Sequence, residues 1–369
     1  MITPGWAWRA RFFVSFLSGD RAEHGPFCAA IDVTRRCNLA CFGCQAHAPG
    51  SGWRPAAVGD DMPWEDFERV CRELRALGTR KMILIGQGEP LLHPRLPDMI
   101  AEAKRLGFHV MLLTNGTLLD GRLAPAIAAS GLDELRVSLW AADEREYVRN
   151  SGGTSPTMFQ RVIDGTRAVS DARPAGRPKT PRIELHRPID RVGFRGLERM
   201  VVLARAAGCD ALSFAPLTPF GQAAAERALT AQEVVELREV LARTGRLARD
   251  AGLACNDAAV LRRYEIGNDV WKSLPCYVGW VDVRIRTNGD VLACAPCRAP
   301  LGNVGTASLA GIWNGAAFRQ FRRQTRTREG LAGIAADCRC DFCCHVLTNE
   351  RLHRILRWVP QRSGPAGAP

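Results

Sequence analysis

The chain has 369 residues, of which 46% are hydrophobic, so it can bury the core of one large domain or of one domain with an appendage. Fourteen cysteines in so long a chain, whose first residues lack the apolar core and cleavage site of a signal peptide, exclude the class of small disulfide-stabilised secreted proteins. We therefore expect a cytoplasmic protein with reduced, mostly metal-binding thiols. No apolar run approaches the roughly 18 residues of a membrane-spanning helix.

The net charge of +12 would suit an acidic partner such as RNA, a phosphorylated substrate or an anionic membrane. Because the arginines are spread widely, a solvated basic surface is the favoured explanation, and we expect no stable nucleic-acid partner. Basic and aromatic residues gather at 6–16 and at 351–362. Both segments fit either a peripheral membrane contact or, as we favour, terminal helices packed onto the body. Residues 363–369 are expected to form a disordered end.

Six short apolar runs alternate with helical patterns, as repeated βα units require. The predicted strands are residues 29–33, 81–86, 109–114, 134–139, 182–186 and 211–216. Their unbroken apolar character predicts strands that are buried on both faces and therefore parallel. Between the first two strands, apolar residues recur with helical period from Phe67 to Leu77, which makes Cys71 a core thiol.

Six such units predict an α/β fold, a partial (β/α)6 TIM-like barrel, with its chemistry on the loops that follow the strands. Three of these loops are unusual: CNLACFGC at 37–44, GQGEP at 86–90 and TNG at 114–116. A [4Fe–4S] cluster that only carries electrons takes four thiolates. With three, one iron keeps an open position for N and O donors, as catalytic zinc does. The alternative is a zinc site that adds His47.

The CxxxCxxC loop after the first strand and the GxGEP loop after the second resemble the radical S-adenosylmethionine (radical SAM) superfamily over roughly residues 28–219. The resemblance implies that the open iron binds S-adenosylmethionine (SAM), which the reduced cluster cleaves to a 5′-deoxyadenosyl radical that abstracts hydrogen from a substrate. It also implies a low-potential electron donor such as flavodoxin or ferredoxin.

The same resemblance assigns roles to individual residues. Cys37, Cys41 and Cys44 would hold the cluster, and Gly86, Gly88 and Glu89 would meet the methionine ammonium, with Asn115 in the third loop beside them. Ser138 would contact the ribose or the carboxylate, and Arg149 would pair with the methionine carboxylate. One departure concerns the packing beside the adenine, because Gly43 stands where the family commonly has an aromatic, with Phe42 one residue earlier.

Towards the C-terminus, a capping box at Thr230 and Glu233 opens a helix, and residues 281–294 predict a β-hairpin with an Asn288-Gly289 turn. Seven cysteines follow within about seventy residues, a density that core packing does not require: Cys276, Cys294, Cys297, Cys338, Cys340, Cys343 and Cys344. Cys28, Cys209 and Cys255, by contrast, are interpreted as ordinary buried thiols.

The spacing Cys276, twelve residues, Gly289, four residues, Cys294 resembles the SPASM and twitch extensions of radical SAM enzymes, as does the segment 302–322. A two-cluster SPASM domain would continue CxxC, five residues, C, three residues, C, whereas no cysteine follows Cys344. The resemblance implies one auxiliary [4Fe–4S] cluster held by Cys276, Cys294, Cys340 and Cys343. Cys297, Cys338 and Cys344 are left as alternates or as ligands of a second cluster. A zinc ribbon of Cys294, Cys297, Cys340 and Cys343 is the other interpretation.

We expect five segments: an N-terminal extension (1–27), the partial barrel (28–225), a helical linker (226–270), a small α+β auxiliary-cluster domain (271–350) and a basic tail (351–369). The stretch before Cys28 is too short for the leader-binding module of many peptide-modifying members. Together with the single-cluster pattern, this favours a small, carbohydrate-like or other biosynthetic substrate. The alternatives are a peptide or protein maturase and a non-catalytic iron-sulfur or zinc protein that binds RNA. His186, Arg187, Thr218 and Gln222 are candidates for substrate contacts by rim position alone.

Overall fold

A ten-stranded sheet forms the centre of the computed structural model, which describes residues 6–48, 60–153, 155–174, 179–267, 272, 274–338, 340 and 343–356. The strands are β1 Cys28–Asp32, β2 Lys81–Ile85, β3 His109–Thr114, β4 Glu134–Ser138, β5 Arg182–Ile189, β6 Ala211–Pro216, β7 Ala254–Cys255, β8 Asp282–Ile285, β9 Asp290–Leu292 and β10 Gly302–Asn303. Strands β1 to β7 are parallel and follow one another in chain order. This confirms the predicted α/β class and all six predicted strands, with β5 reaching three residues further than expected.

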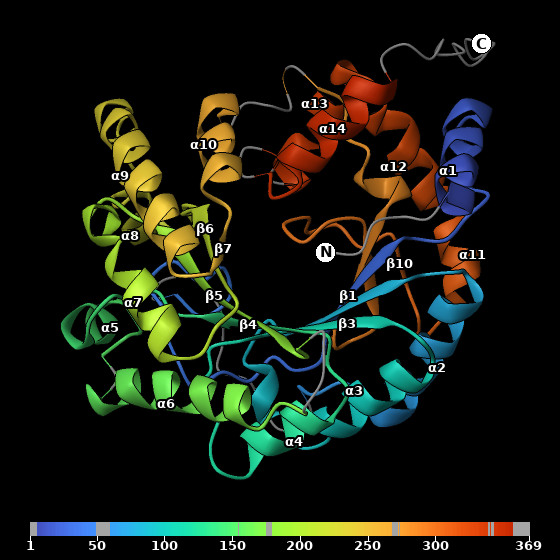
Figure 1. Cartoon of the computed structure of the whole chain (residues 1–369). Coiled ribbons are helices and arrows are strands. Elements are labelled where there is room, and N and C mark those ends of the chain that lie inside the picture. The colour runs from blue at the N-terminus through green and yellow to red at the C-terminus, as the bar shows by residue number, and fades with distance from the viewer. Residues whose placement is uncertain are drawn as a thin grey trace.

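Helices cover the sheet and build the C-terminal part. They are α1 Trp6–Ser18, α2 Trp64–Ala76, α3 Leu96–Arg105, α4 Leu123–Ala129, α5 Glu144–Asn150, α6 Thr157–Asp171, α7 Arg199–Ala206, α8 Gln222–Ala225, α9 Ala231–Asp250, α10 Asp257–Ile266, α11 Leu309–Trp313, α12 Ala316–Thr325, α13 Arg328–Cys338 and α14 Val346–Leu356. In Figure 1, α2, α3, α4 and α6 follow the outside of the curved sheet, and α12 to α14 gather on its other side. Cys71 is buried on α2, as its helical period predicts.

The predicted hairpin is formed by β8 and β9, and Gly289 at its turn has a φ of +85°, which a glycine adopts without strain. The helix opened by Thr230 is α9, and its capping box is present. The sequence pattern did not reveal that β8 also pairs in parallel with β1, from Cys28↔Asp282 to Ile31↔Ile285. The C-terminal part therefore continues the barrel sheet.

The N-terminal helix α1 packs onto the C-terminal part of the chain. Phe12 and Phe16 are buried, and the Phe16 ring lies 5.5 Å from both Tyr277 and Trp280. This agrees with the favoured interpretation of residues 6–16 as a packed terminal helix. In the described part of the chain, none of the helices has the length and apolar character needed to cross a membrane. The predicted tail from residue 357 onward lies outside the described residues.

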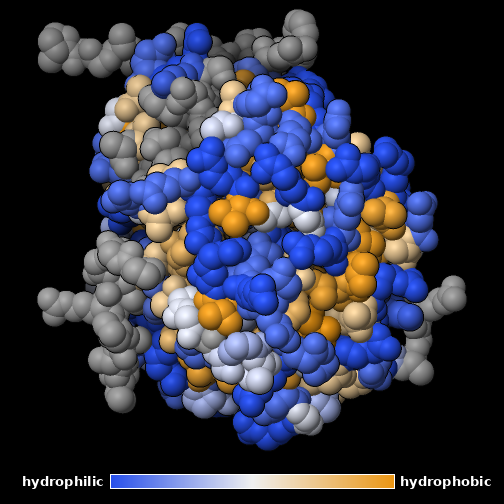
Figure 2. All heavy atoms as spheres, turned by 90° about the vertical axis from the view of Figure 1, so that its left-hand side faces the viewer, coloured by the Kyte–Doolittle hydropathy of each residue, from blue (hydrophilic) through white to orange (hydrophobic). Residues whose placement is uncertain are grey.

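The face of the molecule that carries α5, α8 and α9 is mainly hydrophilic (Figure 2). Hydrophobic side chains appear there in separate groups, in keeping with exposed valines such as Val202 and Val235. Isolated surface groups of this kind are ordinary for a folded protein.

Candidate active site

A cavity of about 380 Å³ lies at the carboxyl ends of the parallel strands, which is within the usual size range of small-molecule sites. It brings the three unusual loops together, as their common position after parallel strands predicts. The predicted residues that line it are Cys37, Cys41, Cys44, Gly88, Glu89, Asn115 and Ser138. Gly86 and Arg149 are absent from its lining.

The cysteine loop is held by its backbone. The Ala40 and Phe42 amides donate to the carbonyls of Ser151 and Asn150, and the Cys44 amide donates to the Cys41 carbonyl. Burial raises the pKa of the Cys37 thiol to about 11 and that of Cys41 as well. Such thiols lose their protons only to a cationic partner, so the donor set fits an iron cluster.

His47 is not grouped with the loop thiols, because no set of three ligand atoms within 4.8 Å of one another contains it in the described part of the chain. Its amide donates to Cys44 Sγ at 3.3 Å, and burial lowers the pKa of its ring. The structure therefore gives no support to His47 as a fourth ligand of the loop.

The glycines of the GQGEP loop permit contact between backbones. A Cβ atom on Gly88 would lie 1.9 Å from the Arg36 carbonyl oxygen, and one on Gly86 would lie 2.8 Å from that of Thr34. The Gly88 and Glu89 amides donate to these same two carbonyls. The sequence predicted that both glycines serve close approach to a ligand. The structure shows that they also let this loop pack against the chain leading into Cys37, while Gly88 lines the cavity.

Glu89 joins the second and third loops. Its buried carboxylate accepts from the Thr114 hydroxyl at 2.5 Å, the Asn115 amide at 2.6 Å and the Leu91 amide at 3.0 Å. Burial is the largest influence and raises the pKa of Glu89 to about 7, against the effect of these donors. A carboxylate has about four acceptor positions, so one remains for an ammonium group.

Helix α5 presents other residues to the cavity than the predicted Arg149, whose side chain is exposed. Tyr147, Asn150 and the following Ser151 line the cavity instead. The Tyr147 hydroxyl is buried and has no hydrogen-bond partner among the described residues. The helical spacing of the sequence could have predicted this. Glu146, Tyr147 and Asn150 lie on the buried face of α5, whereas Arg149 does not.

The space beside Gly43 is filled by other side chains. A Cβ atom on Gly43 would lie 3.0 Å from Leu217 and 3.1 Å from the Trp140 ring. Trp140 and Leu217 line the cavity, and with Phe42 they form a small apolar cluster. The Arg227 guanidinium lies 3.9 Å above the Phe42 ring. The cavity thus has an aromatic wall although residue 43 has no side chain.

Only two of the four rim candidates face the cavity, His186 and Thr218. His186 Nδ1 lies 2.9 Å from the Ser213 hydroxyl, and burial lowers the pKa of His186 to about 4, so its ring is neutral near pH 7. Arg187 is buried in an ion pair with Glu146 at 2.5 Å, and Gln222 is exposed. Rim position in the sequence does not determine which way a side chain points.

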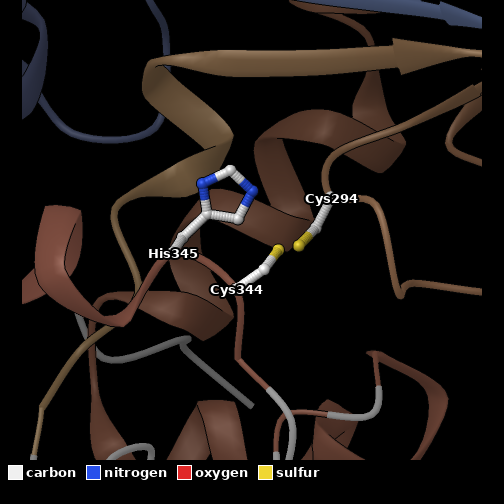
Figure 3. Close-up of side chains that lie close together, drawn as sticks. All are labelled: Cys294, Cys344 and His345. Atoms are coloured by element: carbon white, nitrogen blue, oxygen red, sulfur yellow. The ribbon is translucent and has the colours of Figure 1, made fainter. Parts of the chain in front are cut away.

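The C-terminal cysteines include two close pairs, Cys294 with Cys344 and Cys297 with Cys338. Cys294, Cys344 and His345 place one ligand atom each within 4.8 Å of one another, and Figure 3 shows the sulfurs of Cys294 and Cys344 pointing together. The side-chain nitrogen of Asn349 lies 3.7 Å from Cys276 Sγ and 3.9 Å from Cys343 Sγ, so these two thiols flank the same amide group. The Sγ atoms of Cys297 and Cys338 lie 2.7 Å apart.

These pairings bear on the two interpretations of the C-terminal thiols. Cys276 and Cys343 both face Asn349, and Cys294 contacts Cys344. Besides the hydrogen bond with Cys297 and burial, the charges of Cys340 and Cys276 contribute to raising the pKa of Cys338, so the pair of Cys297 and Cys338 is not separate from these thiols. The sequence left Cys344 as an alternate or as a ligand of a second cluster, because its spacing did not reveal the contact with Cys294. The zinc ribbon gains no support, since the thiol next to Cys297 is Cys338.

A three-thiolate loop over a cavity at the end of a parallel sheet, with a second group of cysteines nearby, defines an iron-sulfur enzyme with an open coordination position. Residues 31–180 match the family model of the radical SAM superfamily, and residues 276–345 match that of the SPASM iron-sulfur cluster-binding domain.

Known proteins resemble the chain over most of its length. A PqqA peptide cyclase from Streptomyces rochei is 32% identical over 323 residues, covering 84% of this chain and 82% of that protein. A PqqA peptide cyclase from Xanthomonas campestris pv. campestris is 27% identical, covering 92% and 89%. The crystal structure of SuiB from Streptococcus suis bound to SAM shares the fold, with a TM-score of 0.64 at 16% identity, covering 94% of this chain and 78% of that one.

The chain belongs to the radical SAM superfamily and carries a SPASM domain. It is an enzyme whose cofactors are SAM and a [4Fe–4S] cluster, and its SPASM domain indicates auxiliary iron-sulfur binding.

Proposed function

We propose that this enzyme closes a ring in a peptide substrate by radical chemistry. The observation that carries the proposal is the 32% identity to a PqqA peptide cyclase over 84% of the chain, because the match extends across both the barrel and the SPASM domain. A peptide substrate replaces the small, carbohydrate-like one that the sequence favoured. That expectation rested on the few residues before Cys28 and on the single-cluster cysteine pattern, and neither feature determines what the cavity accepts.

The residues proposed for the first cluster are Cys37, Cys41 and Cys44, with Glu89 directed to the ammonium of SAM and Ser138 to its ribose or carboxylate. Bound SAM and the reduced cluster would supply a 5′-deoxyadenosyl radical that removes one hydrogen atom from the peptide. Trp140 and Leu217 would exclude water from one wall of the cavity. The neutral ring of His186, on β5 between the strands that precede these two residues, would serve as a hydrogen-bond partner of the peptide.

Ring closure removes a second hydrogen, which leaves as a proton and an electron, so the reaction needs an electron acceptor. We propose an auxiliary cluster at Cys276, Cys294 and Cys343, with its fourth ligand from Cys340 or Cys344. A second cavity supports this route, because Cys343 and Cys344 line it together with Ala215 to Thr218, which also wall the first cavity. A flavodoxin or ferredoxin remains the predicted donor to the first cluster.

The test is anaerobic reconstitution, followed by dithionite, SAM and either synthetic PqqA peptide or the product of a short reading frame adjoining the gene. We expect about eight irons per chain, formation of 5′-deoxyadenosine and a peptide lighter by two hydrogen atoms. Replacing Cys37, Cys41 and Cys44 by Ala should leave about four irons and no product. Cys340→Ala and Cys344→Ala identify the fourth auxiliary ligand by which of them loses iron.

Two results would contradict the proposal. In the first, an aminocyclitol or sugar alcohol stimulates formation of 5′-deoxyadenosine while neither peptide loses mass. This result would favour the hypothesis of a small-molecule substrate. The other is a cyclised peptide from a variant that lacks Cys276 and Cys294, which would remove the auxiliary cluster from the reaction.

A further inference from the structure

Asn349, in the first turn of α14, faces two of the proposed auxiliary ligands. Its side chain is 4% exposed, and its Nδ2 atom lies 3.7 Å from Cys276 Sγ and 3.9 Å from Cys343 Sγ. Its Oδ1 atom accepts a hydrogen bond of 2.8 Å from the backbone amide of Tyr277. One buried amide therefore connects the segment that carries Cys276 with the segment that carries Cys343.

The orientation of this amide follows from the chemistry of its partners. A backbone N–H can only donate, so the side-chain atom that faces the Tyr277 amide must be the oxygen. The NH2 group is thereby turned toward the two sulfurs. One turn later on the same helix, His353 Nδ1 lies 2.8 Å from the Tyr277 hydroxyl. Asn349 is thus oriented by its bond to Tyr277, a residue that His353 also bonds, and neither bond involves the thiols.

Hydrogen bonds to its sulfurs are among the factors that set the potential of an iron-sulfur cluster. Reduction adds negative charge to the cluster, so an N–H donor stabilises the reduced state more than the oxidised state and raises the reduction potential. Burial strengthens this effect, because water does not compete with the donor.

We propose that Asn349 is a positioning residue of the auxiliary cluster, donating N–H to the sulfurs of Cys276 and Cys343 and thereby making the cluster a better acceptor for the electron released at ring closure. This inference rests on the proposed function, since it requires a cluster on these two cysteines. It adds a residue that is not a ligand and that tunes the direction of electron flow.

The experiment measures the potential of the auxiliary cluster alone, in a full chain whose Cys37, Cys41 and Cys44 are replaced by Ala. Asn349→Leu removes the donor at similar volume, and Asn349→Asp keeps an oxygen for Tyr277 while presenting a second oxygen to the sulfurs. In redox titrations followed by electron paramagnetic resonance, we expect retained iron and a more negative midpoint potential for both variants, with the larger shift for Asn349→Asp.

Asn314→Leu is the matched control. Like Asn349, Asn314 is an asparagine whose side chain bonds to backbone, here twice to Ala22, and its Oδ1 atom also accepts from Arg322. No hydrogen bond to sulfur is found for it in the described part of the chain. The midpoint potential of the auxiliary cluster in Asn314→Leu should equal that of the parent protein. If Asn349→Leu loses iron, Asn349→Asp decides, because it preserves the bond to Tyr277. An unchanged potential with full iron, or loss of iron from both variants, overturns the inference. Absence of iron from the parent with Asn349 intact overturns the ligand assignment instead.

Discussion

The Tyr147 hydroxyl is a polar group that the protein buries and leaves unpaired within the described residues. Its ring packs against Phe159 at 5.9 Å, and its side chain lines the cavity beside the cysteine loop. Burial, followed by the charges of Cys41 and Glu89, raises the pKa of Tyr147, so the group remains a neutral O–H donor. A buried unpaired hydroxyl costs about 1–3 kcal/mol, which a ligand that offers an acceptor can recover.

We predict that Tyr147→Phe has opposite effects on stability and on binding. The free energy of unfolding without SAM should rise by about 1 kcal/mol, because the unpaired hydroxyl is gone, and SAM should bind roughly tenfold more weakly. Urea unfolding and equilibrium dialysis of the reconstituted protein measure the two quantities. Tyr277→Phe is the control, since that hydroxyl has a partner in His353 and lies outside the cavity, so its loss should lower stability and spare SAM binding. Weaker folding with unchanged SAM affinity in Tyr147→Phe would refute the prediction.

At this scale, most of the predicted residues that line the cavity lie in the short loops that follow the strands. Cys37, Cys41 and Cys44 are held near one another by their spacing within one loop, and Glu89 lies in the loop that follows β2. Arg149 was assigned to the methionine carboxylate because its position resembles that of a basic residue in the family. Neighbouring residues of a helix point to different sides, so position alone does not show that Arg149 faces the cavity. Tyr147, two residues earlier, has the inward phase. When a ligand-binding role is assigned to a helical residue by resemblance, the residue must therefore lie on the face of the helix that points to the site, in addition to matching in position.

At the scale of elements, β1 to β6 could be predicted because their apolar runs are unbroken and the turns between them are strong. The pairing of β8 with β1 could not, since a four-residue strand carries no signal of its partner. A similar limit applies to the C-terminal thiols. A two-cluster SPASM pattern would place cysteines six and ten residues after Cys343, and these positions hold Asn349 and His353. The sequence shows that the thiols are missing there, but only the structure shows both side chains bonded to Tyr277.

The docking of helix α1 depends on a neutral histidine. His24 packs against the rings of Trp8 at 4.7 Å and Phe12 at 5.9 Å, and burial lowers the pKa of His24 to about 4. The Nε2 atom of His24 has no hydrogen-bond partner in the described part of the chain, so an added proton there would be buried without an acceptor. Because the folded pKa lies below the unfolded value of about 6.5, the stabilisation is present above pH 6.5 and is lost as the pH falls toward 4.

We predict that the free energy of unfolding falls by up to about 3 kcal/mol between pH 6.5 and 4 through His24 alone. His24→Phe keeps an aromatic ring and cannot titrate. The difference in stability between the natural chain and His24→Phe should therefore change over this pH range, although acid affects both proteins in other ways. Denaturant unfolding at a series of pH values, with tryptophan fluorescence as the probe of α1, measures this difference. A difference that does not vary with pH would show that His24 is not the titrating group.

At the scale of the whole molecule, the sheet runs without interruption from the barrel into the cysteine-rich part. Strand β1 lies between β2, which leads into the GQGEP loop, and β8, which leads through the hairpin to Cys294. The two cluster regions are thus attached to neighbouring strands, and a displacement of β1 relative to β8 would alter both. This arrangement favours one cooperative folding unit over two independent domains.

A buried ion pair fastens these two strands together. Arg284 on β8 donates to both carboxylate oxygens of Asp32 on β1, at 2.7 and 3.0 Å, and to the carbonyl of Ala295, the residue after Cys294. Asp32 is fully buried. Removing one member of such a pair leaves an uncompensated charge and costs about 3–5 kcal/mol, whereas removing both costs much less.

We therefore predict that Arg284→Met lowers the free energy of unfolding by about 3–5 kcal/mol and that adding Asp32→Asn restores most of the loss. Circular dichroism and the visible absorbance of the clusters should decrease together in one denaturant transition for the natural chain. In Arg284→Met they should still coincide, at lower denaturant, because the sheet remains continuous. Additive effects of the two substitutions would mean that the pair is not coupled. An auxiliary-cluster signal lost well before the helical signal would mean that the cysteine-rich part unfolds by itself despite the shared sheet.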